Sequence, residues 1–212
     1  MIITRVPFIL TVSIASVCAY DFSWAPQWSP GVVAPGVPAW TDITSCYPGE
    51  TNVWGVTFDD GPGVDTGVVL NYFSGKGMYA TFWVIGANIL GLPDTLAATY
   101  AADHSIGTHT WSHPDLTSLS ADQVVAELVY GARALFYEVT GMAPKYFRPP
   151  YGSLSDNVRN IAAGLGLHAV TWSQDSADWS YTGNMGNVPA AFQNWMNQGL
   201  DAKISLEHDY YP

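Results

Sequence analysis

The amino-acid sequence predicts an α/β fold in which a parallel sheet closes into a single (β/α) barrel. Short apolar runs typical of buried strands alternate along the chain with segments of helical periodicity, and this alternation favours a parallel sheet. Ionisable residues stand at or just beyond the ends of these runs, where barrel enzymes keep their catalytic groups. A length of 212 residues with a hydrophobic content of 48% suits one domain with one core.

The first 49 residues precede the predicted barrel. A short basic start is followed by an apolar stretch too brief to span a bilayer. Residues 17–19 supply the small side chains that a signal peptidase needs, with cleavage after Ala19. We therefore expect residues 1–19 to be a signal peptide and the protein to be secreted, with possible retention at a cell wall; a retained membrane anchor is the alternative. Residues 20–49 are rich in Pro, Gly, Trp and Ser and predict an extended arm on the domain formed by residues 50–212.

Apolar runs predict the strands of the barrel at 53–58, 79–85, 105–108, 146–147, 167–172 and 203–206. Helices are expected between them, at 66–73, 95–102, 155–164 and 188–198. The clearest helix follows a capping-box pattern at 119–123 and has Val124, Leu128, Leu135 and Phe136 near one face. In a barrel the carboxyl ends of all these strands lie on one face, so the polar residues that follow them should meet there.

Composition limits the classes of partner. A formal charge of −11 argues against nucleic acid, whose phosphates are bound by basic side chains. Nine Trp within an aromatic content of 14% suit stacking on sugar rings, although Trp is equally a large core residue. Cys18 and Cys46 are the two cysteines of the sequence, so removal of residues 1–19 is expected to leave Cys46 unpaired, whether as a free thiol, in an intermolecular bond, or with a partner missing from the sequence.

Two motifs together predict a metal site. Asp59 and Asp60 end the first predicted strand, and because neighbouring strand residues point to opposite faces, one carboxylate is expected to bind metal and the other to meet water. His109 and His113 are four residues apart, which on a helical turn would bring both imidazoles to one face. Each motif alone has a structural alternative. The two aspartates could cap backbone N–H groups in a turn, and the two histidines could be a chance pattern. With Asp60 they form a two-His, one-carboxylate set with open positions, which suits zinc and a bound water.

Arg148 precedes two prolines, Tyr151 and Gly152. Because neither proline has an N–H, Tyr151 offers the first backbone donor after Arg148, and Gly152 permits close approach of another group. We predict that the Tyr151 N–H is an oxyanion donor; a rigid turn with Arg148 at the surface is the alternative.

Asp175 and His208 follow two further apolar runs and are expected at the same end of the barrel. A histidine beside a buried carboxylate has a raised pKa and can act as a general acid near neutral pH. A purely structural histidine is the alternative reading of His208.

Five segments in this order resemble the motifs of the polysaccharide deacetylases of carbohydrate esterase family 4, which have the NodB-homology fold. They are 57–63 (TFDDGPG), 109–113 (HTWSH), 148–152 (RPPYG), 175–179 (DSADW) and 204–209 (ISLEHD). The amino-acid sequences of the third and fifth segments are most similar to those of fungal chitin deacetylases. The resemblance implies a distorted (β/α) barrel, and an enzyme that hydrolyses the N-acetyl groups of N-acetylglucosamine residues in chitin or chito-oligosaccharides and releases acetate.

The resemblance also implies a role for each matched residue. A single divalent metal, Zn²⁺ in first place and Co²⁺ or a similar ion in second, would be bound by Asp60, His109 and His113. Asp59 would be the catalytic base, oriented by Arg148, and the Tyr151 N–H would stabilise the oxyanion. His208 would protonate the departing amine with Asp175 as its partner, while Leu206 and Trp179 would form the pocket for the acetyl methyl group.

Relatives usually continue after the last strand with a further helix, so the resemblance implies that the barrel of this sequence lacks its last helix. Several fungal relatives end with a cysteine paired to one near the mature N-terminus, which makes Cys46 the N-terminal half of such a bridge. The expected partner is an N-acetylated polysaccharide or oligosaccharide, and the protein is expected to be a monomer that binds neither nucleic acid nor, once the signal is removed, a membrane.

Three other functions fit parts of the sequence. The substrate could be another acetylated polymer, peptidoglycan or acetylxylan, because the loops of the groove decide it. A carbohydrate-binding relative without turnover is the second. The third is a non-haem Fe(II) oxygenase, which also uses two histidines and one carboxylate but leaves Asp59, Arg148 and His208 without roles.

Overall fold

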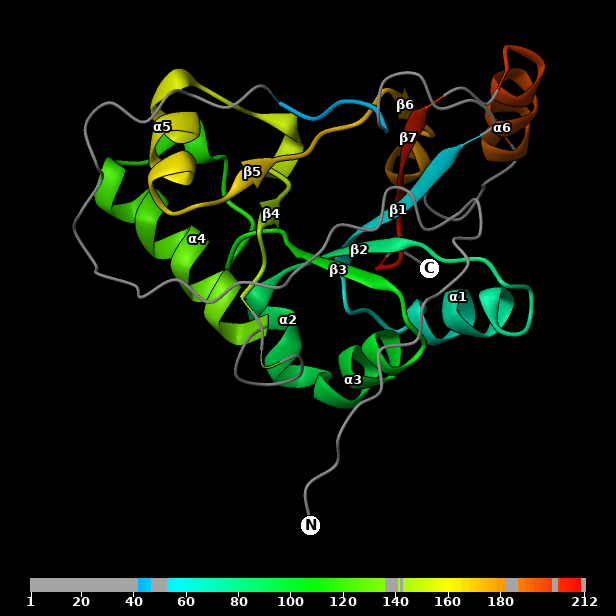
Figure 1. Ribbon diagram of the computed structural model, residues 1–212, viewed down its shortest axis with the longest axis horizontal. Helices are drawn as coiled ribbons and strands as arrows, with labels where there is room; N and C mark the ends of the chain where they lie inside the picture. The colour runs from blue at the N-terminus through cyan, green and yellow to red at the C-terminus, as the bar shows by residue number, and fades with distance from the viewer. Residues whose placement is uncertain are drawn as a thin grey trace, which may run out of the picture.

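Parallel strands form a single curled sheet in the order β5-β4-β3-β2-β1-β7-β6 (Figure 1). The computed structural model describes residues 42–46, 53–135, 141, 143–181, 187–199 and 202–210. The strands are β1 (Trp54–Gly61), β2 (Thr81–Val84), β3 (Ser105–Thr108), β4 (Tyr146–Phe147), β5 (His168–Ala169), β6 (Gln174–Asp175) and β7 (Lys203–His208). The predicted distorted (β/α) barrel is confirmed, with the sheet open between its edge strands β5 and β6.

Helices cover the outside of this sheet (Figure 1). They are α1 (Thr66–Phe73), α2 (Gly86–Gly91), α3 (Pro93–Ala101), α4 (Ala121–Leu135), α5 (Asp156–Gly164) and α6 (Val188–Asn197). Short 3₁₀ helices within the described ranges are η2 (Leu116–Ser118), η4 (Pro150–Gly152) and η5 (Asp178–Ser180). The sequence predicted neither α2 nor β6, because each is too short to show a period.

Helix α4 begins with the capping box that the sequence predicts. The Ser120 N–H donates to the Gln123 side-chain oxygen at 3.0 Å, and the Gln123 N–H is 3.4 Å from the Ser120 hydroxyl. Val124 and Leu128 then face the core and are fully buried. They pack with Phe147 of β4 and Ile161 of α5, so α4 and α5 together cover one half of the sheet. Phe136, expected on the same face, lies outside the described residues.

A second core cluster lies between α1, α3 and the centre of the sheet. It is built from Phe73, Phe82, Leu96 and Ile106, all buried. Burying each side chain of this size contributes about 1.5–3 kcal/mol, so both clusters stabilise the sheet against its covering helices.

Residues 42–46 bridge the open side of the sheet. The Ile43 N–H donates to the carbonyl of Ala169 in β5 at 3.0 Å, and the Cys46 N–H donates to the carbonyl of Ala202, next to β7, at 2.9 Å. Asp42 adds an ion pair with Arg159 of α5 at 2.7 Å. Cys46 is disulfide-bonded in the full chain. The expectation of an unpaired Cys46 concerns the chain without residues 1–19 and stays a prediction.

The predicted signal peptide at 1–19 and the arm residues 20–41 and 47–49 lie outside the described residues. Within the described part of the chain, we find no helix with the length and apolar character needed to cross a bilayer.

Candidate metal and catalytic site

A cavity of about 330 Å³ opens where the strands end at their carboxyl termini. Every predicted site residue except Arg148 lines it, and Trp172, which the sequence did not single out, completes the wall. The lining is Asp59, Asp60, His109, His113, Tyr151, Trp172, Asp175, Trp179, Leu206 and His208. Residues that are up to 149 positions apart in the chain thus meet as the parallel topology predicts.

Both carboxylates of the Asp59-Asp60 pair face this cavity, because β1 does not keep regular strand geometry to its end. Asp60 has a positive φ of 71°, and the pairing of β1 with β2 shifts register between Asp59 and Gly61. The expectation that the two acids point to opposite faces is therefore wrong at this bulge. A Cβ at Gly61 would lie 2.5 Å from the Asp209 carboxylate, so glycine lets that side chain approach the end of β1 closely.

His109 and His113 approach each other in an irregular loop after β3, not on the helical turn that their spacing predicted. Thr110 and His113 have positive φ values of 70° and 61°, which fold the loop back on itself. The Thr110 hydroxyl accepts the His113 N–H at 3.1 Å and closes the turn. The two imidazole centroids lie 4.8 Å apart as a result.

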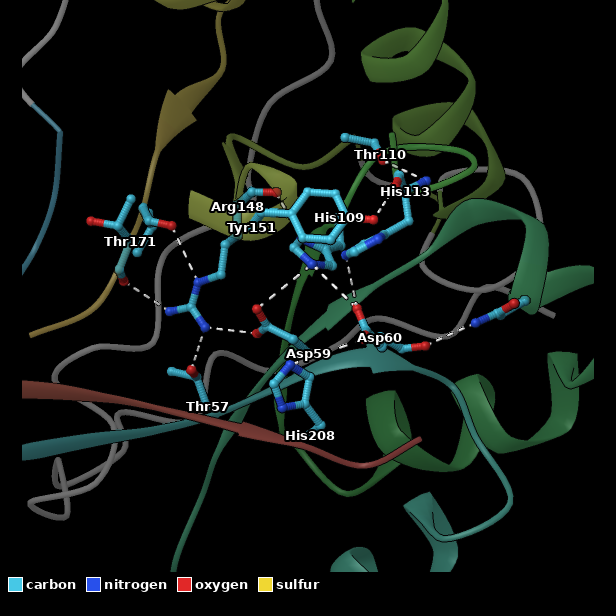
Figure 2. A network of polar contacts seen from close by, with 12 residues as sticks. Thr57, Asp59, Asp60, His109, Thr110, His113, Arg148, Tyr151, Thr171 and His208 are labelled. Atoms are coloured by element: carbon cyan, nitrogen blue, oxygen red, sulfur yellow. Dashed lines mark hydrogen bonds and ion pairs between the residues drawn. The ribbon is translucent and has the colours of Figure 1, made fainter. Parts of the chain in front are cut away.

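Asp60, His109 and His113 present one ligand atom each within 4.8 Å of one another. Oδ1 of Asp60 lies 3.4 Å from Nε2 of His109 and 3.2 Å from Nε2 of His113 (Figure 2). This oxygen is buried, and it receives no hydrogen bond from the described residues. A buried carboxylate oxygen facing two imidazole nitrogens is well suited to a shared cation.

The tautomer of His109 also suits the binding of a cation. Its Nδ1 lies 2.7 Å from the carbonyl oxygen of Arg148. A carbonyl can only accept, so Nδ1 carries the proton and the lone pair of a neutral ring is on Nε2, facing Asp60. Backbone carbonyls orient metal-binding histidines in this way in many proteins. The residues present therefore fit a divalent metal.

Arg148 lies beneath the cavity and is fully buried. Its Nη1 donates to Asp59 at 2.7 Å and to the Thr57 hydroxyl at 2.5 Å (Figure 2). Nε and Nη2 donate to the carbonyls of Val170 and Thr171 at 3.2 and 2.9 Å. The predicted contact with Asp59 is present, and the alternative of a surface arginine is wrong. Oδ2 of Asp59 stays on the metal side, 3.7 Å from Nε2 of His109.

His208 is held by Asp178, and not by Asp175 as the resemblance implied. Oδ1 of Asp178 lies 2.7 Å from Nδ1 of His208, and Oδ2 accepts the His208 backbone N–H at 2.7 Å. Asp175 is exposed and accepts the N–H of Ala177, which has a positive φ of 54°. Asp175 is thus hydrogen-bonded within its own loop. The turn at Ala177 reverses the chain, so that Asp178 contacts His208 of β7.

Burial lowers the pKa of His208, but the hydrogen bond to Asp178 and the nearby carboxylates Asp59 and Asp60 outweigh it and raise the pKa above its ordinary value. Nε2 of His208 lies 4.0 Å from Oδ2 of Asp60, so the ring nitrogen that is not bonded to Asp178 points to the ligand set.

Aromatic side chains form the outer wall of the cavity. Tyr151 is 67% exposed, and its ring centroid is 4.7 Å from that of His113. Its positive φ of 58° interrupts the helical geometry of η4 directly after Pro149 and Pro150. Trp179 is 54% exposed at the rim, while Leu206 is buried at the floor. The rim of the cavity therefore offers apolar faces, with the polar groups below them.

Comparisons with known proteins identify the family to which the chain belongs. The family model described as polysaccharide deacetylase matches residues 47–170. Chitin deacetylase 1 of Cryptococcus neoformans is 36% identical over 81% of the chain, and chitin deacetylase 1 of Saccharomyces cerevisiae is 40% identical over 79% of it. The chain spans 39% and 54% of the lengths of these two relatives.

A solved structure gives the same result for the fold. The chitin deacetylase of the fungal pathogen Colletotrichum lindemuthianum superposes with a TM-score of 0.75 and 30% sequence identity, covering 82% of this chain and 80% of that one. The matched family model and the fungal relatives together show that the chain belongs to the polysaccharide deacetylase family.

Proposed function

We propose that the protein is a metal-dependent hydrolase that removes N-acetyl groups from N-acetylglucosamine residues of chitin or chito-oligosaccharides and releases acetate. One observation carries the proposal. The triangle of Asp60, His109 and His113 is flanked by a carboxylate held by Arg148 and an imidazole held by Asp178, each with one atom within 4.0 Å of the ligand residues. A base and an acid beside one ligand set are what amide hydrolysis requires.

Asp60, His109 and His113 would hold the metal and leave positions open for water and for the acetamide oxygen. When bound, a divalent ion, Zn²⁺ in first place, polarises that carbonyl and lowers the pKa of water from about 15.7 toward about 7. The identity of the ion is part of the proposal, because two imidazoles and one carboxylate also suit Co²⁺.

Asp59 accepts the proton of the attacking water. Arg148 occupies Oδ1 of Asp59, which leaves Oδ2 on the side of the ligand set. The guanidinium holds the carboxylate in one orientation. Attack of the water oxygen on the acetamide carbon gives a tetrahedral oxyanion, toward which the Tyr151 backbone N–H is proposed to donate.

His208 donates a proton to the departing amine. The C–N bond breaks, the sugar leaves as the amine, and acetate remains. Asp178 accepts the Nδ1 proton, so the mobile proton of the imidazolium is on Nε2, which points to the ligand set. The raised pKa of His208 keeps a protonated population near neutral pH.

The substrate class follows from the cavity walls and from the relatives. Leu206 and Trp179 offer an apolar pocket for the acetyl methyl group, and the exposed rings of Tyr151 and Trp179 suit the faces of sugar rings. The curated relatives are chitin deacetylases, which favours chitin over peptidoglycan or acetylxylan. A binding protein without turnover is less favoured, because the ligand set, Asp59 and His208 are all present.

The direct experiment is acetate release from chito-oligosaccharides, peptidoglycan and acetylxylan, with a chelator and after addition of Zn²⁺. We expect acetate from chito-oligosaccharides, loss with chelator and recovery with Zn²⁺. Asp59→Asn and His208→Ala should each lower the rate by about 10²- to 10⁴-fold. Asp94→Asn, an exposed aspartate on α3, is the matched control and should keep wild-type activity. Chelator-insensitive activity, or iron with oxygen-dependent turnover, would contradict the proposal.

We also propose that the protein is secreted through the signal at residues 1–19, which its basic start and apolar stretch support. Expression of the full chain in a secreting host, followed by N-terminal sequencing of the protein in the medium, tests it. Retention in the cell with residues 1–19 attached would contradict it.

A further inference from the structure

The loop that carries His113 lies between two helices, α2 and α4, which stand side by side (Figure 1). Glu127 of α4 reaches this loop with its carboxylate. Oε2 accepts the backbone N–H of Trp111 at 2.9 Å and that of Ser112 at 2.8 Å. Oε1 accepts the Ser112 hydroxyl at 2.6 Å. One side chain therefore satisfies three donors in the two residues that precede His113.

Helix α2 holds the same peptide units from the other side. The N–H of Gly86 donates to the carbonyl of Thr110 at 2.9 Å, and the N–H of Ala87 donates to the carbonyl of Trp111 at 2.9 Å. The side chain of Asn88, one residue further, donates to the carbonyl of Asp60 at 2.8 Å. The loop is thus fixed between donors from α2 and the acceptor from α4, and α2 also contacts the third ligand residue.

This loop needs such support because its backbone is unusual. Thr110 and His113 both have positive φ, a region that non-glycine residues seldom occupy. Residues stay in such conformations only where surrounding contacts determine them. Three donors of the loop bond to the one Glu127 carboxylate, and hydrogen bonds to carboxylates are about twice as strong as neutral ones.

We propose that Glu127 is a positioning residue for the metal site. It acts through the loop backbone and keeps His113 Nε2 within 3.2 Å of Asp60 Oδ1, at the separation a shared ion requires. Without the carboxylate, the N–H groups at 111 and 112 lose their acceptor, and the peptide units before His113 can rotate. The inference rests on the proposed metal site and adds a residue that lies outside every motif of the family resemblance.

The test measures metal binding by the full chain after chelation, with Zn²⁺ followed by calorimetry and Co²⁺ followed by its visible absorption. Loss of an outer partner of a metal site typically weakens affinity by about 10- to 100-fold. We expect Glu127→Ala to weaken Zn²⁺ binding in this range and to change the Co²⁺ spectrum. Ser112→Ala removes one bond of three and should have a smaller effect. Asp122→Ala, an exposed acid on the same helix, is the control and should match wild type.

Glu127→Gln keeps the shape of the side chain and carries the test if the alanine variant does not fold. Its amide oxygen can accept the two N–H groups, but its NH₂ group cannot accept the Ser112 hydroxyl, so an intermediate affinity is expected. Folded Glu127 variants that bind Zn²⁺ as tightly as wild type would overturn the inference. If wild type itself binds no metal, the proposed function fails instead, so the two failures are distinguishable.

Discussion

The carboxylate of Asp178 accepts two hydrogen bonds from His208, one from Nδ1 and one from the backbone N–H, each at 2.7 Å. Its Oδ1 also accepts the N–H of Trp179 at 2.8 Å. A single buried side chain therefore fixes the ring of the proposed acid, the strand end that carries it, and the tryptophan at the rim. Asp175, three residues earlier, is exposed and makes none of these contacts.

Asp178→Ala is predicted to move the alkaline limb of the kcat/KM against pH profile to lower pH. His208 must be protonated to act as acid, and the bond to Asp178 is the largest effect that raises its pKa. Activity falls as pH rises through that pKa, so without Asp178 the fall begins earlier and the loss is greater at pH 8 than at pH 6. Asp175→Ala is the matched control and should keep the limb in place. A shift with Asp175→Ala but not with Asp178→Ala would contradict the assignment.

The residues around the cavity could be predicted from sequence to a large extent, because the carboxyl ends of parallel strands converge by topology alone. The capping box of Ser120 and Gln123 likewise predicted where α4 begins, since both partners lie within one turn. The spacing of His109 and His113 correctly predicted that the two imidazoles are close. The predicted helical turn was wrong, because a loop with positive φ at Thr110 brings them together equally well.

Contacts between distant segments were not predictable in this way. The choice of Asp178 over Asp175 depends on a turn with positive φ at Ala177, which no local pattern indicates. Glu127 lies 16 residues after Trp111 on a helix whose position only the packed structure defines. The close approach of Asp209 to Gly61 likewise joins segments that are far apart in the sequence.

Arg148→Met is predicted to destabilise the protein strongly. It would leave Asp59 buried without a partner, and breaking a buried ion pair in this way costs about 3–5 kcal/mol. Arg148→Lys keeps the charge but cannot reach four acceptors with a planar fork, so it should recover only part of the loss. Urea unfolding followed by circular dichroism measures both variants.

The control for Arg148 is Arg159→Met. Arg159 pairs with Asp42 through side chains that are 27% and 21% exposed, and such partly solvated pairs contribute at most about 1 kcal/mol. If Arg148→Met were as stable as Arg159→Met, the buried pair would not be holding the site.

Gly131→Ala is predicted to disturb the His113 loop from the side of α4. A Cβ at this position would lie 2.6 Å from the Thr108 hydroxyl and 2.8 Å from the Thr110 backbone, and the latter cannot rotate away. Overpacking of this kind costs about 1–3 kcal/mol, and the displaced loop should bind Zn²⁺ more weakly.

Gly67→Ala provides the opposite case on α1. A Cβ at Gly67 meets nothing within 4 Å, so the substitution should raise the free energy of unfolding by up to about 1 kcal/mol through helix propensity and leave Zn²⁺ binding unchanged. Thermal unfolding and zinc titration of the two variants test the contrast, which is lost if Gly131→Ala also gains stability.

Glu207→Gln is predicted to flatten the dependence of stability on pH. Burial raises the pKa of Glu207 to about 8, and the hydrogen bond from the Ser205 hydroxyl at 3.1 Å offsets this only in part. The folded-state pKa is thus above the ordinary 4.5. Below pH 4.5 the carboxyl is protonated in both states, and its full contribution to stability is present. As pH rises toward 8, only the unfolded state releases the proton, so stability is lost by up to about 1.4 kcal/mol per pH unit.

Glutamine cannot titrate. In urea unfolding, the free energy of unfolding of the variant relative to wild type should therefore rise progressively from pH 5 to pH 8. Asp209, whose pKa burial raises to about 7, contributes a slope of the same sign that remains in the variant. The difference between variant and wild type therefore isolates Glu207, while Asp94→Asn should show the wild-type slope. Parallel stability curves for Glu207→Gln and wild type would contradict this prediction. They would mean that Glu207 has the same pKa in the folded and unfolded states and is ionised in the folded protein at neutral pH.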